Sequence, residues 1–458
     1  MSIVLNNLIQ ETYNRNSEKL RDYPTVLLEV LKEKHYWPDI KIKKFKNDNN
    51  LCLLHNSYKK DNIDGFRELY DECRSIVLDF SRSINNNVVI SYANSIPIRT
   101  SISNYTTTLY EPTDNSYVAV DGTLISVYYH NNKWYFGSSC CPDINSSKFS
   151  HPTKTHGYML DEVLFEIYKN NSNVNVGDPN ISNVLRDLLT SNLSPLFSYE
   201  FVLVHYENKH IIDYTTDLGN EYKCLFHINT KNRITLVEED VITKPLSYLG
   251  IKYAYKFQTP EEAIQSLNAN TNNSIIVKKA NKLYKISTDA ILHIEEVNAN
   301  NYNIWYNLIY VYMLQKPNYT VNDYIVEFCC NSTSTTTIPI DACDSIHMMF
   351  MVISEVFYNL YVSTTNYYPK YKRFKVNMDL DRTLHPVIRF HLAQLRNQQV
   401  VNYTKAILTQ KEVFNYICHS NNIKNIKKII NHFAVINKYN LPENIIAIFN
   451  QMMINLSF

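Results

Sequence analysis

The feature that most constrains the fold is a change in sequence pattern near residue 300. Between about residues 40 and 295, short runs of β-branched and aromatic residues alternate with clusters of Asn, Asp and Ser. After residue 300, apolar residues recur at helical spacing. This change predicts two domains, an α+β domain over 1–297 and an all-helical domain over 300–458. A chain of 458 residues is long enough for each domain to bury its own core.

The first domain is predicted to contain nine strands interrupted by helices. The strands are expected at Val88–Tyr92, Tyr117–Val120, Thr123–His130, Lys133–Ser138, Tyr199–His205, Ile211–Tyr214, Tyr222–Ile228, Ser274–Lys279 and Leu283–Ser287. Helices are expected at 16–34, 157–168 and 180–190, and in the second domain at 345–362, 386–397, 404–418, 423–433 and 442–456. The Asn131-Asn132 pair tolerates positive φ, so its flanking strands should form a hairpin.

Composition narrows the compartment and the partners. Seven Gly against 36 Tyr, with an excess of Asn, Ile and Lys, indicates a low-GC genome such as that of a large DNA virus, a parasite or an AT-rich bacterium. A net charge of +1 gives no global field, so any nucleic-acid site must be a local patch. Nine Cys without a CxxC pair favour a reduced, intracellular compartment.

No segment predicts membrane insertion or secretion. The N-terminus lacks the apolar stretch of a signal peptide, and Ile346–Phe357 is too short to span a bilayer and contains Glu355. We therefore expect a soluble, cytoplasmic protein with no membrane partner.

The segment with the clearest chemical pattern is Tyr117-Val-Ala-Val-Asp-Gly-Thr-Leu-Ile-Ser-Val-Tyr. One strand is predicted to end at Asp121-Gly122 and another to begin at Thr123, which presents the intervening loop at a sheet edge. An isolated Asp-Gly pair indicates only a turn. Its meaning comes from the flanking segments.

These segments resemble the motifs of the phage-type, ATP-dependent RNA ligase 1 family, a branch of the covalent nucleotidyltransferase superfamily. The family's Lys-x-Asp-Gly motif carries the lysine that attacks the α-phosphorus of ATP, and its glycine, here Gly122, lets the backbone approach the nucleotide. Residues 121–128 are close to the family's DGSLVSTY pattern. The resemblance implies an RNA ligase-like nucleotidyltransferase domain built of antiparallel sheets.

Two upstream segments and one downstream segment extend the resemblance. Glu72-Cys-Arg-Ser-Ile-Val resembles the ECRG segment, whose arginine contacts the nucleotide and corresponds to Arg74. Ile96-Pro-Ile-Arg-Thr resembles Pro-x-x-Lys-Phe-Phe-Asn, and the lysine position falls on Arg99 or Thr100. Phe197-Ser-Tyr-Glu-Phe-Val is similar to the third motif, with Glu200 as its carboxylate.

The last motifs follow in the family's order. Residues 272–277 stand where the Glu-Gly-x-Val motif belongs, which places Asn272 at the metal-binding position. Residues 283–287 stand where the Lys-x-Lys motif belongs, with Lys285 and Ser287 at its two lysine positions. An ordered set over 72–290 is far more specific than any one motif.

The departures from the family pattern concern its chemistry. Ala119 has no nitrogen lone pair, so the lysyl-adenylate cannot form there by the usual route. Asn272 is a weak ligand for Mg²⁺, and Ser287 removes one cation that would stabilise charge on the phosphates. Ser75 and Asn273 replace motif glycines. An engineered substitution would explain Ala119 alone, so natural loss of catalysis is the favoured interpretation.

The favoured function is therefore an RNA ligase 1-like protein that has lost ligase catalysis and binds RNA or nucleotide, or serves as an assembly scaffold. Arg74, Glu200 and Lys285 either still bind a nucleotide or are relics held by packing, and the sequence leaves both open. ATP and Mg²⁺ are the implied cofactors if any activity of the pocket survives.

RNA is the expected partner of three basic runs, at 41–46, 370–375 and 424–428, where lysines alternate with aromatic or aliphatic residues. A single run of this kind is more often a solvated strand or helix face. Protein partners are expected on the helical domain.

Two rival interpretations remain. An active ATP-dependent RNA ligase could be a designed mutant or use another lysine, such as Lys133 or Lys278. A purely structural protein could instead form an interface through Met348–Met351, although such patches are usually core.

Overall fold

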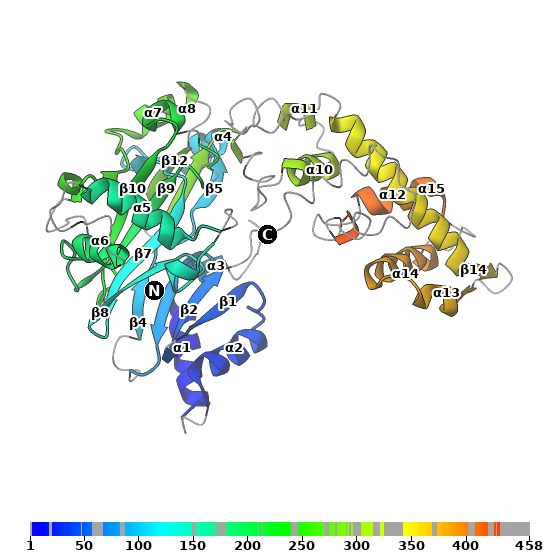
Figure 1. The fold of residues 1–458 in the computed structure, drawn as a ribbon, viewed down its shortest axis with the longest axis horizontal. Helices are drawn as coiled ribbons and strands as arrows, with labels where there is room; N and C mark the ends of the chain where they lie inside the picture. Colours follow the sequence, from blue (N-terminus) through cyan, green and yellow to red (C-terminus); the bar gives the residue numbers. More distant parts are fainter. Residues whose placement is uncertain are drawn as a thin grey trace. The chain divides into compact units, whose positions relative to one another are not determined.

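The computed structural model divides into two compact units, Met1–His293 and Ile294–Phe458 (Figure 1). It describes residues 2–17, 21–46, 48–56, 67–82, 88–148, 153–169, 174, 180–208, 210–212, 214–239, 246–269, 274–279, 282–289, 291–292, 295, 304–314, 321–324, 342–368, 373–401, 408–419, 426 and 428–430. The first unit is mixed α/β with mainly antiparallel sheets, and the second is mainly helical.

Two helices and a four-stranded sheet form the N-terminal part. Helix α1 (Ile3–Arg15) packs on α2 (Tyr23–Glu33), and α2 packs on strands β1 (Ile40–Phe45) and β2 (Asp48–Asn56). After α3 (Arg67–Glu72), β3 (Ile76–Asp79) and β4 (Val89–Tyr92) complete the antiparallel order β1-β2-β3-β4. The helix expected over 16–34 is confirmed over Tyr23–Glu33, but its first residues are not helical with it, because Asn16 ends α1 and Asp22 caps the start of α2.

The second sheet has the order β11-β10-β9-β7-β8. Its strands are β7 (Thr123–His130), β8 (Lys133–Ser138), β9 (Phe197–His205), β10 (Lys223–Asn232) and β11 (Lys252–Tyr253). Asn131 and Asn132 adopt φ of 46° and 61°, which confirms the predicted two-residue hairpin turn. Helices α5 (His156–Tyr168) and α6 (Ile181–Thr190) cover one face of this sheet with apolar side chains (Figure 1).

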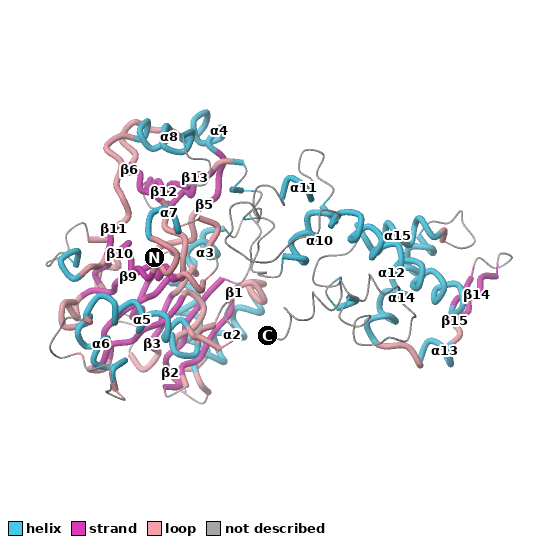
Figure 2. Tube along the Cα trace, turned by 45° about the horizontal axis from the view of Figure 1, so that its top comes forward, coloured by secondary structure: helices cyan, strands magenta, loops and turns pink. Residues whose placement is uncertain are grey.

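The third sheet has the order β5-β13-β12-β6, formed by β5 (Ile98–Ser101), β13 (Lys282–Ser287), β12 (Ser274–Lys279) and β6 (Asn115–Val118). Helix α8 (Pro260–Ala269) packs on its apolar face (Figure 2). The short elements of this unit are α4 (Ile102–Asn104), the π-helix Tyr105–Leu109, α7 (Thr215–Leu218) and the 3₁₀ turns Ile144–Ser146 and Leu246–Leu249.

The second unit packs around α12 (Ala342–Thr364), together with α10 (Ile304–Leu314), α11 (Val321–Tyr324), α13 (Met378–Arg382), α14 (Pro386–Val401) and α15 (Gln410–His419). The prediction of an all-helical domain is wrong, because β14 (Thr365–Tyr368) and β15 (Arg373–Val376) form an antiparallel pair. Both segments are rich in Thr, Tyr, Phe and Val, which favour a pleated strand.

One described helix segment, Cys343–Thr364, is long and apolar enough by length and composition to cross a membrane. The apolar stretch identified from the sequence, Ile346–Phe357, is therefore shorter than the apolar helix segment in the structure. Residues such as Phe350 and Phe357 are fully buried and pack against neighbouring helices of the same unit, which accounts for the apolar character of the segment.

Most strand predictions agree with the structure, and one is wrong. Thr123–His130, Lys133–Ser138 and Ser274–Lys279 are strands with the predicted bounds. Ile211–Tyr214 is not a strand where it is described, because the backbone amides of Ile211 and Ile212 donate to the Asp121 carboxylate, at 2.5 and 3.4 Å, instead of pairing with a strand.

Candidate functional site

A row of buried polar side chains crosses three neighbouring strands of the second sheet. Ser126 on β7 lies directly opposite Glu200 on β9, which lies opposite Asn229 on β10. Directly opposed residues of antiparallel strands share a face, so the three side chains lie side by side on the face away from α5 and α6. All three are buried.

Several atoms of this row have no hydrogen-bond partner among the described residues. They are Ser126 Oγ, Glu200 Oε2 and both side-chain amide atoms of Asn229. A buried polar atom that lacks a partner costs roughly 1–3 kcal/mol. Such a cluster therefore indicates a place where a polar ligand or ordered water completes the hydrogen bonds.

Arg74, which follows α3, faces this row. Glu200 Oε1 accepts a hydrogen bond from the backbone amide of Asn94 at 2.6 Å, and its carboxylate interacts favourably with the Arg74 guanidinium. Burial lowers the pKa of Arg74, and Glu200 opposes that shift. The structure thus brings together two residues that the sequence assigned to one nucleotide pocket.

Lys231, near the end of β10, was missed by the sequence analysis. Its side chain lies on the same face as Asn229, because their partners Ser198 and Glu200 are two residues apart on β9. Only 6% of Lys231 is exposed, and its ammonium lies 4.5 Å from the centroid of the Tyr92 ring. Burial lowers the pKa of Lys231, with Glu200 and Glu238 acting in the opposite direction.

Ala119 lies beside the third sheet. Its backbone amide donates to the carbonyl of Ser274 at 2.9 Å, and the hydroxyl of Ser274 lies 2.7 Å from that of Ser287. Ala119 is 4% exposed, and Ser287 is fully buried. Ser274 therefore links Ala119, at the expected nucleophile position, to Ser287, at one of the two expected lysine positions. Neither Ala119 nor Ser287 has a side-chain nitrogen that could attack phosphorus.

Arg99 and Lys285 are register partners on the adjacent strands β5 and β13. They share the face of Ser287, opposite to the apolar face that packs on α8. The predicted metal position, Asn272, lies outside the described residues, as does Asn273.

Asp121 and Gly122 have structural roles. The carboxylate of Asp121 binds the backbone amides of Ile211 and Ile212, and its own amide donates to the Tyr214 hydroxyl at 2.7 Å. A Cβ at Gly122 would lie 2.4 Å from the carbonyl oxygen of Leu203, so only glycine allows this approach to β9.

The two lysines considered as alternative nucleophiles differ in position. Lys133 is exposed at the hairpin turn, with its ammonium 4.7 Å from the Tyr135 ring centroid. Lys278 on β12 forms an ion pair with Glu238 and lies 5.2 Å from the Tyr117 ring centroid. Lys278 also raises the electrostatic potential at Lys231, so the third sheet contributes charge to the same region.

A second charged cluster lies at the end of β9. His205 Nε2 lies 3.0 Å from Glu162 Oε2, and Glu207 completes a set whose ligand atoms lie within 4.8 Å of one another. The ammonium of Lys154 forms ion pairs with both glutamates. His205 Nδ1 accepts from the Glu207 amide, which leaves the proton on Nε2. A divalent ion would have to displace both cation and proton, so this cluster fits a structural ion-pair network better.

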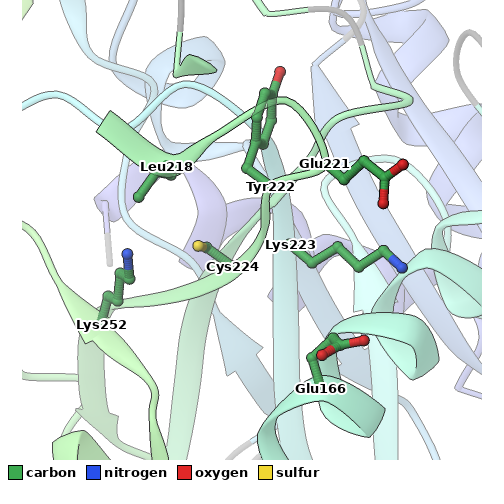
Figure 3. A pocket seen from close by; sticks show the side chains of 7 residues that line it. All are labelled: Glu166, Leu218, Glu221, Tyr222, Lys223, Cys224 and Lys252. Atoms are coloured by element: carbon green, nitrogen blue, oxygen red, sulfur yellow. The ribbon is translucent and has the colours of Figure 1, made fainter. Parts of the chain in front are cut away.

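A cavity of about 340 Å³ lies beside α7, lined by Glu166, Leu218, Glu221, Tyr222, Lys223, Cys224 and Lys252 (Figure 3). Two glutamates and two lysines line it, so their charges balance. Burial raises the pKa of the Cys224 thiol, and the nearby Lys252 ammonium acts in the opposite direction. This cavity lacks the unpartnered buried atoms of the row around Glu200 and is the weaker candidate.

The methionine-rich segment of α12 is divided between core and surface. Met349 and Phe350 are buried, whereas Met348 and Met351 are 45% and 44% exposed.

No protein-family model and no curated protein matches the chain. Among solved structures, a putative ATP-dependent DNA ligase from Aquifex aeolicus is 12% identical, with a TM-score of 0.35, over 72% of this chain and 79% of the other. An archaeal ATP-dependent RNA ligase is 10% identical, with a TM-score of 0.34, over 67% and 71%. A second form of an archaeal ATP-dependent RNA ligase gives 10%, 0.36, 71% and 79%. Similarity at this level does not define a family for the chain.

Proposed function

We propose that the first unit is an RNA ligase 1-like nucleotidyltransferase unit that binds a nucleotide but has lost the covalent chemistry of a ligase. The observation that carries this proposal is the row of buried, unpartnered polar atoms on Ser126, Glu200 and Asn229, beside Arg74. Ribose hydroxyls and base edges offer both donors and acceptors, which this row requires.

The loss of chemistry is supported by the surroundings of Ala119. The hydroxyls of its neighbours Ser274 and Ser287 are hydrogen-bonded to each other, and none of the three side chains carries an amine. Lys278 is held by Glu238, and Lys133 lies at an exposed turn. These are poor settings for a nucleophilic lysine, which needs a free amine beside the phosphate.

The described residues around Glu200 fit ATP and Mg²⁺ only in part. The unpartnered atoms suit the nucleoside of ATP. When bound, Mg²⁺ would neutralise phosphate charge, but the position that the resemblance gives it, Asn272, lies outside the described residues. RNA is the proposed partner of the lysines on β1, and a protein partner is proposed for the exposed Met348 and Met351 on α12.

The proposal is tested with α-labelled ATP and with Mg²⁺ or Mn²⁺. We expect saturable binding of ATP in equilibrium dialysis and no labelled protein band after denaturing electrophoresis. Ala119→Lys should bind ATP and remain unlabelled or weakly labelled, because Ser287 still lacks the phosphate-binding charge.

A strongly labelled band from the unmodified protein would show that it is an active nucleotidyltransferase. Strong labelling of Ala119→Lys alone would show that the rest of the site is competent. Glu200→Gln is the matched site variant and should weaken ATP binding, whereas Glu261→Gln, on the exposed start of α8, should not. An absence of ATP binding would overturn the proposal and would favour a purely structural protein.

A further inference from the structure

Lys231 is buried, and no anion among the described residues contacts its ammonium. Among the described residues no hydrogen bond or ion pair to it is found, although the ring of Tyr92 lies 4.5 Å away. The carboxylates that act on it from a distance have other partners: Glu238 pairs with Lys278, Glu72 accepts from Ser2 and from Tyr92, and Glu200 accepts from Asn94. Burying an ammonium without a paired anion is costly, and groups of this kind cluster at functional sites, so Lys231 is a candidate for binding an anionic ligand.

We propose that Lys231 forms an anion subsite beside the row of Ser126, Glu200 and Asn229 and binds a phosphate group of the nucleotide. This inference rests on the proposed function. It deepens that function by assigning the phosphate end of the ligand to Lys231 and its neutral end to the row of Ser126, Glu200 and Asn229.

The geometry of β10 supports this division. Asn229 and Lys231 are two residues apart on one face of the strand, so their side chains follow each other along that face. The amide of Asn229 has an unpartnered donor and an unpartnered acceptor, so it can serve either part of the ligand. Glu200 would repel a phosphate and accept from a hydroxyl, which places the phosphate at Lys231.

Binding of a phosphate should also change the protonation of Lys231. Burial holds the pKa of the free lysine below its ordinary value. A bound phosphate raises that pKa, so the protein takes up protons on binding at pH values between the two. Neutral adenosine supplies no charge and should cause no such uptake.

The test compares AMP with adenosine by isothermal titration calorimetry in two buffers of different ionisation enthalpy. We expect Lys231→Met to weaken AMP binding by about tenfold or more, as for loss of a hydrogen bond to a charged group, and to leave adenosine binding unchanged. Lys231→Arg should retain AMP binding but show less proton uptake than the unmodified protein, because arginine stays charged. Any change in the protonation of the AMP phosphate itself is common to both proteins.

Lys282→Met, an exposed lysine on β13, is the control and should bind AMP normally. Thermal unfolding of each variant verifies that it is folded, and Lys231→Arg keeps the test decisive if the Met variant is not. Equal losses of AMP and adenosine binding in Lys231→Met, or normal AMP binding, would overturn the anion subsite while leaving nucleotide binding intact. Failure of the unmodified protein to bind either ligand would overturn the proposed function and this inference with it.

Discussion

At the scale of single residues, Gly122 is fixed by packing between two strands. Gly122→Ala would place a Cβ 2.4 Å from the Leu203 carbonyl oxygen and 2.7 Å from a methyl of Val202. Backbone must move to relieve the first contact, so we expect a loss of about 1–3 kcal/mol in the free energy of unfolding. Urea denaturation measures it.

Gly219→Ala is the control for that loss. Gly219 has a φ of +81° and a ψ of 171°, a conformation essentially restricted to glycine, and nothing lies within 4 Å of its ideal Cβ, so only the backbone conformation is penalised, by roughly 1–3 kcal/mol. A loss well below about 1 kcal/mol in Gly122→Ala would show that β9 accommodates the methyl group at residue 122.

The same scale shows what could be predicted for the site. Arg74 and Glu200 were found because the ordered motifs name them, and the structure places them in electrostatic contact. The sequence did not show that the carboxylate of Asp121 would bind backbone amides, because its partners Ile211 and Ile212 are about ninety residues away. Long-range partners of this kind are decided by the packed fold.

At the scale of elements, β10 explains why Lys231 was missed. Its strand was predicted to end at Ile228, but pairing with β9 continues to Asn232 through Asn, Thr and Lys. Tertiary pairing overrides the low strand propensity of Asn and Lys. The register also shifts between His227 and Asn229, so simple alternation along the sequence could not assign Lys231 to the face of Glu200.

The first two sheets are joined by a buried pair between β3 and β7. His130 Nε2 lies 3.0 Å from Asp79 Oδ2, and Ser81 donates two further hydrogen bonds to Asp79. Burial raises the pKa of Asp79, but the neighbouring His130 imidazole and the hydrogen bonds from Ser81 outweigh it and hold the pKa below its ordinary value. The charged carboxylate therefore contributes to the stability of the folded state.

We expect Asp79→Asn to lose about 1–3 kcal/mol of unfolding free energy near neutral pH. A carboxyl whose folded pKa is lowered stabilises the fold above its unfolded pKa of about 4, and this stability is lost as the pH falls through the folded pKa. The difference between variant and parent should therefore shrink at acid pH. Urea denaturation across pH measures it, with exposed Asp187→Asn as the control; a difference independent of pH would contradict the role of the charge.

At the scale of the whole molecule, the division into two units follows the change in sequence pattern near residue 300. The helices predicted at 345–362, 386–397 and 404–418 correspond to α12, α14 and α15, because their apolar spacing is regular, whereas the helix predicted at 442–456 and most of that at 423–433 lie outside the described residues. The sequence did not predict the pair of β14 and β15, whose strands are four residues long. The second basic run, residues 370–375, falls partly between these strands in the sequence and partly on β15. Residues 369–372 lie outside the described part of the chain, and so does most of the third run at 424–428.

The net charge of +1 makes RNA binding a test of local charge. On β1, Lys43 is exposed, as is Lys46 just after the strand, whereas Lys44 pairs with Asp22.

If β1 contacts the RNA backbone, the full chain should bind single-stranded RNA with an affinity that falls as salt rises. Lys43→Gln/Lys46→Gln should then reduce the slope of log K against log salt by about 1.4, from roughly 0.7 per phosphate contact. Fluorescence anisotropy over a salt series measures the slope, and Lys169→Gln, an exposed lysine after α5 that pairs with Glu166, is the matched control. An unchanged slope would remove β1 from the RNA surface, and absence of binding at low salt would favour a protein-interaction scaffold.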